Sequence, residues 1–143
     1  MDSQLLKRIA KIAKNAGYVI LATSDKEGKP HIATAGELKY DTNEDLLRIS
    51  EWFCSKTVAN LHVNEHISIV AWEPEVDKGY QLQCSLKEVR NTAVLNGYAA
   101  KEAEKHIPQK RHELLVKLEK ITEFSHTIHS DENLINLQKE AET

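Results

Sequence analysis

Residues 18–38 read "YVILATSDKEGKPHIATAGEL" and decide the fold predicted for this chain. Their first part, "YVILATS", is a short apolar run rich in strand-forming residues, and "DKEGKP" has the aspartate, glycine and proline of a turn. "HIATAGEL" then continues as a second strand. The stretch therefore predicts a β-hairpin.

The chain after this hairpin predicts more strands and one short helix. "LLRISEWF" (46–53) follows the turn-forming "DTNED", and "HISIVAW" (66–72) alternates as a strand does. A further strand is predicted from Tyr80 through about Val89. Between the strands at 46–53 and 66–72, the segment from Thr57 to Asn64 has room for about two helical turns. The middle of the chain thus predicts about six short, mostly antiparallel strands with one short helix inserted.

The N-terminal segment is predicted to be a surface helix. Residues 3–16 carry an apolar stripe with basic side chains largely off it, and Gly17 follows where a helix C-cap is expected. The stripe consists of Leu5, Ile9, Ile12, Ala13 and Ala16. This helix is expected to cover the core.

The C-terminal segment, residues 97–143, is predicted to be a helical extension. It is rich in helix formers, and Pro108 is expected to divide it into a short helix and a longer one. Apolar residues recur at helical spacing at Leu114, Leu115, Leu118 and Ile121. Ser130 is a candidate N-cap for a last short helix.

Composition favours one small protein domain that does not bind nucleic acid. The 143 residues are 41% apolar, which predicts a single domain over 1–143 with a barrel at about 17–95 and the extension at about 97–143. The formal net charge is -3 and no basic block stands out, so nucleic acid is not an expected partner. The chain has no run of about 18 apolar residues, its N-terminus is too charged for a signal peptide, and its two cysteines are isolated. We therefore expect a cytoplasmic protein without a membrane partner.

Ser55, Lys56 and Thr57 are the first candidates for ligand binding. The first turn of a helix has unpaired backbone N–H groups and a partial positive charge, so it favours a phosphate. Two hydroxyls can donate to phosphate oxygens there, and Lys56 can add a full charge. The alternative is a helix N-cap, the usual role of Ser or Thr at such a position.

The order of these elements resembles the FMN-binding split-barrel proteins related to pyridoxamine 5'-phosphate oxidase. The most specific part is the pairing of G-x-P at 28–30 with K-T-x-x-N-L at 56–61, followed by a strand that begins near Ile67. "GYQLQCS" (79–85) is similar to the family's next strand, which often has glycine where this chain has Cys84. The similarity covers roughly residues 17–86 and implies a mainly β fold with helices.

The resemblance also implies a cofactor site and a homodimer with FMN at the subunit interface. It places the FMN phosphate at Ser55, Lys56 and Thr57, and the ribityl chain beside Ile49 and Ser50. Trp72 of the partner subunit or Gln81 of the partner subunit would close the site. The isoalloxazine ring would lie along the second strand, at Ala33, Thr34, Ala35 and Gly36. Without the resemblance, small residues in such a strand indicate tight barrel packing, and a tryptophan indicates a core or interface anchor.

One departure limits what the resemblance implies about the substrate. Family members that oxidise pyridoxamine phosphate carry an arginine in the second strand, where this chain has Ala33 or an apolar neighbour, and Glu37 is a nearby charge of the wrong sign. We therefore predict an FMN-dependent oxidoreductase with an unknown substrate and no identified acid or base. The alternatives are a non-catalytic module that stores or senses FMN, haem or a deazaflavin, and a dimeric scaffold with an empty site. The histidines show no recognisable ligand spacing, so no metal site is predicted.

Overall fold

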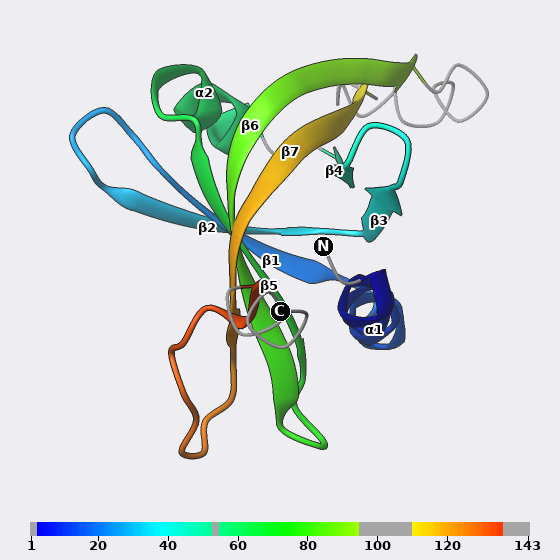
Figure 1. The fold of residues 1–143 in the computed structure, drawn as a ribbon. Helices are drawn as coiled ribbons and strands as arrows, with labels where there is room; N and C mark the ends of the chain where they lie inside the picture. The colour runs from blue at the N-terminus through cyan, green and yellow to red at the C-terminus, as the bar shows by residue number, and fades with distance from the viewer. Residues whose placement is uncertain (1–2, 53–54, 95–109, 136–143) are drawn as a thin grey trace.

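A seven-stranded sheet and two helices form the fold of residues 3–52, 55–94 and 110–135, the part of the chain that this computed structural model describes (Figure 1). The strand order is β2-β1-β5-β6-β7-β4-β3, and every pairing is antiparallel. The expected mainly β architecture with helices is confirmed. Neither helix in these ranges combines the length and hydrophobicity that crossing a membrane requires.

The two edge strands of this sheet are halves of one stretch of chain. β2 (Pro30–Ala35) pairs with β1 (Val19–Ser24), and β3 (Glu37–Asp41) pairs with β4 (Leu46–Trp52). Only Gly36 separates β2 from β3, and its backbone N–H donates to the Ser50 carbonyl oxygen at 3.3 Å. The sheet therefore closes on itself through this bend, as a split barrel does. The predicted hairpin is confirmed as β1–β2, and "HIATAGEL" is divided between two strands instead of one.

The remaining strands complete the wall between β1 and β4. β5 (His66–Glu73) lies beside β1 and forms a hairpin with β6 (Lys78–Val94). β7 (Lys110–Glu123) then fills the place between β6 and β4. α2 (Ser55–Val63) connects β4 to β5 and packs against β1 and β2.

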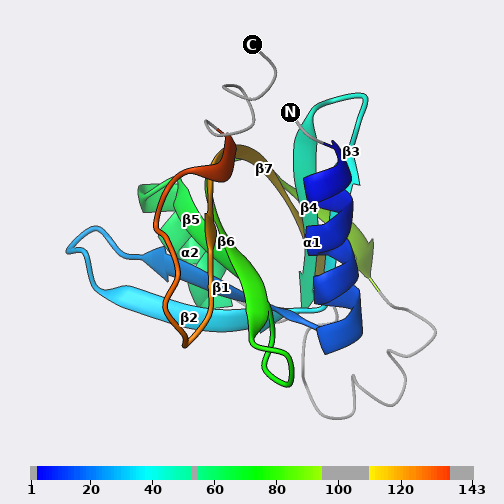
Figure 2. The same ribbon diagram turned by 60° about the horizontal axis from the view of Figure 1, so that its bottom comes forward.

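One apolar cluster fills the space enclosed by these elements. Strand side chains that alternate inward, among them Leu21, Ile69 and Leu82, are almost completely buried in it. α1 (Ser3–Ala16) packs against β3 and β5 (Figure 2). Its predicted stripe is buried except for Ala16, which is half-buried, and Leu6 is buried with it. Gly17 ends the helix with a φ of 87°, its N–H donating to the Ala13 carbonyl oxygen at 2.9 Å, so the predicted C-cap is confirmed.

The prediction of a C-terminal helix is wrong for residues 110–123, which form β7. The same residues also satisfy a period of two, because Leu114, Val116 and Leu118 all face the core. Between Gln83 and Cys84 the register skips Glu119, and this bulge returns Ile121 to the inner face. As a strand, this segment pairs with the backbone N–H and C=O groups on the open edges of both β6 and β4. These hydrogen bonds outweigh its helix propensity.

The rest of the predicted extension is described only in part. Residues 97–109, with Pro108, and residues 136–143 lie outside the described ranges. Residues 134 and 135 are helical, and the side chain that accepts from their first turn is Asn133, whose Oδ1 lies 3.1 Å from the Ile135 N–H. The same oxygen accepts from the Ile121 N–H at 3.2 Å, so it ties this turn to β7. The predicted N-cap, Ser130, instead accepts from the Glu132 N–H at 3.0 Å.

We predict that Gly79→Ala destabilises the fold by about 1–3 kcal/mol, because it overpacks the β5–β6 ladder. A Cβ at Gly79 would lie 2.5 Å from the Ala71 carbonyl oxygen and 2.8 Å from Trp72 Cα, and backbone atoms cannot move aside cheaply. Gly36→Ala is the matched control, since a Cβ there meets nothing within 4 Å. Urea unfolding of both variants is the measurement. Equal free energies of unfolding for the two would contradict this account of the ladder.

Candidate functional site

The predicted cofactor residues come from β2, β4 and α2, and those of β2 and β4 meet where the barrel closes. Gly36 and Ser50 are joined by the hydrogen bond that links the two ends of the sheet. β2, which ends just before Gly36, is paired with β1. On the other side, β4 continues past Ser50 to Trp52, and α2 begins at Ser55. The structure therefore joins Gly36 to Ser50 and packs α2 against β1 and β2.

The small residues of β2 lie on two different faces of the sheet. Ala33 pairs with Leu21 and Ala35 pairs with Val19, both of which face the core, so Ala33 and Ala35 share the inner face. Ala35 is part of the core cluster, which is the packing role that small residues suggested. Thr34 is exposed on the outer face. A flat ring can therefore approach this strand along its backbone and at Thr34, but not at the side chain of Ala35.

Ile49 and Ser50 also differ in what they can offer. The Ile49 side chain is 0% exposed in the core, so only its backbone could contact a ligand. Ser50 points to the other face of β4 and is nearly buried beside Glu37 of β3. Of the pair, Ser50 has the only polar side chain.

The first turn of α2 contains a buried hydroxyl that has no partner. Ser55 and Lys56 are exposed, whereas Thr57 is 1% exposed. No hydrogen-bond partner for Thr57 Oγ1 is found among the described residues. A buried hydroxyl without a partner costs about 1–3 kcal/mol, so such an atom indicates a site for a ligand or water. Sequence reasoning chose Thr57 for its position in the helix, and the structure adds this reason.

Two amide side chains hold α2 in place on β1. Asn60, which is buried, donates from Nδ2 to Thr23 Oγ1 at 3.1 Å, and Asn64 donates to Ser24 Oγ at 2.8 Å. These bonds fix the helix that carries Thr57. Asn60 belongs to the K-T-x-x-N-L motif, which gives this motif residue a structural role.

Lys56 lines an open pocket between α2 and the β1–β2 turn. The pocket measures about 360 Å³ and also includes Asp25, Lys26 and Glu27 of the turn. Two cations and two anions thus surround it, and the turn itself is ordered by Asp25 Oδ1, which accepts from two backbone N–H groups at 2.9 Å. The lining therefore has no net charge, and Lys56 is the lysine that α2 contributes to it.

Trp72 lies at the end of β5 that is remote from α2. Its indole Nε1 donates to Asp77 Oδ1 at 3.1 Å, and its ring meets the ring of Phe124 edge-on at 5.7 Å. Five residues of strand separate Trp72 from Ile67, or about 17 Å at 3.3 Å per residue. Within one subunit, therefore, Trp72 does not join the residues of α2.

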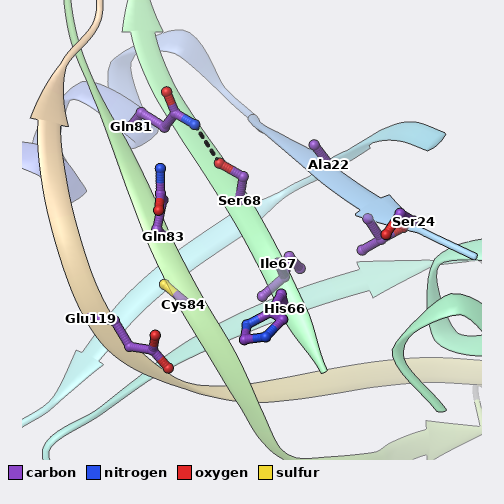
Figure 3. Close-up of a pocket in the computed structure, with 10 residues that line it drawn as sticks. Ala22, Ser24, His66, Ile67, Ser68, Gln81, Gln83, Cys84 and Glu119 are labelled. Carbon is purple, nitrogen blue, oxygen red and sulfur yellow. Dashed lines mark hydrogen bonds between the residues drawn. The ribbon is translucent and has the colours of Figure 1, made fainter. Parts of the chain in front are cut away.

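Gln81 lines a polar pocket of about 370 Å³ on the outer face of β1, β5 and β6 (Figure 3). Its Nε2 donates to Ser68 Oγ at 2.7 Å. His66, Gln83 and Glu119 also line this pocket, and sequence reasoning missed all three. Glu119 could not have been found, because it was assigned to a helix and reaches the pocket from the bulge in β7. Burial, and then the nearby Glu119 charge, raise the pKa of the Cys84 thiol, so Cys84 is an unreactive member of the lining.

The histidines do not form a metal site in the part of the chain that is described. No group of three or more His, Cys, Asp or Glu side chains there is placed to hold a metal ion. His126 packs beside Trp72 and its Nε2 lies 3.5 Å from Asp77 Oδ2, while His106 lies outside the described ranges.

Comparison with known proteins places this geometry in a family. Residues 5–125 match the family described as pyridoxamine 5'-phosphate oxidase. No curated protein matches the chain.

Solved structures share the fold at low sequence identity. An FMN-binding protein from Syntrophomonas wolfei is 22% identical, with 90% of this chain and 91% of that chain covered and a TM-score of 0.64. A Clostridium acetobutylicum protein related to general stress protein 26 is 15% identical over 96% and 99% of the two chains, with a TM-score of 0.65. HutZ, a haem storage protein from Vibrio cholerae, is 16% identical over 80% and 91%, with a TM-score of 0.52.

We predict that Asp77 makes stability fall in acid. Burial raises its pKa, but hydrogen bonds from the His126 backbone N–H (2.9 Å) and the Trp72 indole outweigh this, so the pKa lies below its ordinary value. A lowered folded pKa gives stability that is present above the unfolded value of about 3.9 and is lost as the pH falls through the folded value.

The measurement is urea unfolding at pH 6 and pH 3. Asp77→Asn should lose less free energy of unfolding between the two pH values than the wild type, whereas the exposed neighbour Glu75→Gln should behave like the wild type. An unchanged pH dependence in Asp77→Asn would show that this carboxylate contributes nothing.

Proposed function

The chain belongs to the pyridoxamine 5'-phosphate oxidase family, and on that premise we propose that it is a homodimeric flavoprotein that binds FMN as an oxidoreductase. Each subunit would be a single split-barrel domain. When bound, FMN supplies the redox chemistry, and the protein supplies position and electrostatics.

The observation that carries this proposal is the buried Thr57 hydroxyl in the first turn of α2. A phosphate at this helix terminus would give Thr57 Oγ1 the partner that it lacks among the described residues. Ser55 and Lys56 are exposed on the same turn and can add a hydroxyl and a charge. The residues present therefore fit a phosphate group.

The rest of the flavin would extend from α2 toward β2. Ser50, the backbone of Ile49 and the backbone of Ala33 to Gly36 would contact it there, and the hydrogen bond between Gly36 and Ser50 supports this grouping. The exposed Thr34 can add a hydroxyl beside the ring. Since one subunit leaves this strand open on its outer face, a second subunit is needed to cover the ring.

Homodimerisation would bring the remote candidates into the site. Trp72 and Gln81 lie on the outer face of β5 and β6, together with the half-buried Ile20 and Val70. Ile32 of β2 adds a side chain that is 69% exposed to this face. Such a semi-apolar face is suited to pairing with a second copy.

Haem binding is a second candidate function. It is favoured by the fold shared with the haem storage protein HutZ and by His66, which lines the pocket beside Gln81. The visible spectrum of the purified protein separates the two candidates, because flavin and haem absorb differently.

We predict that Lys56→Ala and Thr57→Val both weaken FMN binding without weakening the fold. Each removes one contact to a charged phosphate, worth on the order of 1.5–3 kcal/mol. Thr57→Val should leave the apo protein equally stable or more stable, since it removes a buried hydroxyl that has no partner.

Fluorescence titration with FMN and urea unfolding are the two measurements, with Lys7→Ala on α1 as the control that should bind FMN normally. If Thr57→Val destabilises the apo protein and binds FMN as the wild type does, the hydroxyl serves the fold and the phosphate site is elsewhere.

We also predict that pyridoxamine 5'-phosphate is not an efficient substrate. A second phosphate beside the FMN phosphate requires extra cations, and Lys39 is the only lysine or arginine from residue 30 to 41. Lys39 lies 3.8 Å from Glu37, and the nearby Arg48 is held by Asp41 at 2.6 Å and by Glu113 at 3.3 Å. The measurement is pyridoxal phosphate formation by the FMN-loaded protein. Turnover of about 1 per second or faster, within the usual enzyme range, would overturn the prediction.

A further inference from the structure

We propose that the groove between α1 and β3 binds a small amphipathic anion, a molecule with an apolar body and a carboxylate or phosphate head. The groove measures about 410 Å³, within the size range of small-molecule sites. It does not include the first turn of α2, and Gly36 is the one residue that it shares with the proposed flavin site.

The floor of this groove is apolar. Ala10 and Ala13 line it from α1, and Leu38, which is 8% exposed, lines it from β3. Gly36 completes the lining, and a Cβ placed there would meet nothing within 4 Å, so space is open beside it. An apolar body is therefore the part of a ligand that fits between the two elements.

The rim of the groove carries excess positive charge. Lys11 and Lys14 reach it from α1 and Lys39 reaches it from β3, against the single carboxylate of Glu37. Glu37 lies 3.8 Å from Lys39 Nζ, so it balances that lysine first. Lys11 and Lys14 are exposed and belong to no ion pair in the described part of the chain. Their charges favour an anionic head above the apolar floor.

The positive charge of α1 disfavours pairing of this helix with the same helix of a second subunit. The helix contains four basic residues and no acidic residue, although the full chain has a net charge of -3. Two copies of such a face would repel each other, so a homodimer is not expected to form by pairing α1 with α1. The two other cations, Lys7 and Arg8, are exposed on the helix but do not line the groove.

The test uses the full chain saturated with FMN and the fluorescent probe 1-anilinonaphthalene-8-sulfonate, which has an apolar body and one anionic group. The probe should bind at one site per chain. Octyl phosphate should displace it, whereas octyl glucoside, which lacks the charge, and inorganic phosphate, which lacks the body, should not do so at the same concentration.

Two double variants with the same charge change locate the site. Lys11→Glu with Lys14→Glu should weaken probe binding at least tenfold, and Lys7→Glu with Arg8→Glu should change it less than twofold. Ala10→Phe, which fills the floor and keeps the charge, should also weaken it. Near-ultraviolet circular dichroism of each variant verifies that the fold is intact.

The proposal would be overturned if both double variants lost affinity equally, because the helix would then attract anions without using the groove. A second assay measures co-sedimentation of the protein with phosphatidylglycerol vesicles. If both double variants lost co-sedimentation equally and the wild type showed no probe site in solution, the charges would serve a lipid surface, and the proposal would be overturned as well. Normal FMN binding by the Lys11 and Lys14 double variant keeps this result separate from the flavin proposal.

Discussion

The closure of the sheet at Gly36 is the constraint on which the rest of the structure depends. One stretch of chain, residues 30–41, must pair with β1 along its first half and with β4 along its second half. The hydrogen bond between the Gly36 N–H and the Ser50 carbonyl oxygen marks the point where the two pairings meet. Because β4 runs on from this point into α2, the bend also determines where the helix begins relative to β2.

The candidate site follows from this closure. The first turn of α2 combines helix-terminal N–H groups with a buried hydroxyl that lacks a partner among the described residues, and α2 packs against β1 and β2. The amide of Asn60, bonded to Thr23, holds the helix against β1 so that this turn is presented in a fixed position. A phosphate and a flat ring are the two parts of a ligand that this arrangement suits.

The sequence allowed the local elements to be predicted, because their signals depend on near neighbours. The β1–β2 hairpin, α1 with its Gly17 cap, and β5 each carry a period or a turn that the structure confirms. β7 could not be predicted in this way, since Leu114, Leu115, Leu118 and Ile121 match a helical period while Leu114, Val116 and Leu118 match a strand. The decision lies in pairing with β6 and β4, which are distant in the sequence.

The site was predictable to the same extent. Ser55 to Thr57 were chosen from a motif at the start of a helix, and the structure places them there. That Ile49 and Ala35 turn their side chains into the core could be known only from the pairing of their strands. His66, Gln83 and Glu119 share a pocket through strands that meet only after the barrel closes.

A crystal structure of the protein grown with FMN tests the central claim most directly. We expect a two-fold dimer in which a phosphate oxygen lies within hydrogen-bond distance of Thr57 Oγ1, about 2.5–3.0 Å, and the ring runs along the backbone of β2 under the partner subunit. A flavin whose phosphate is bound away from the first turn of α2, or a monomer that binds FMN without a second subunit, would contradict the account.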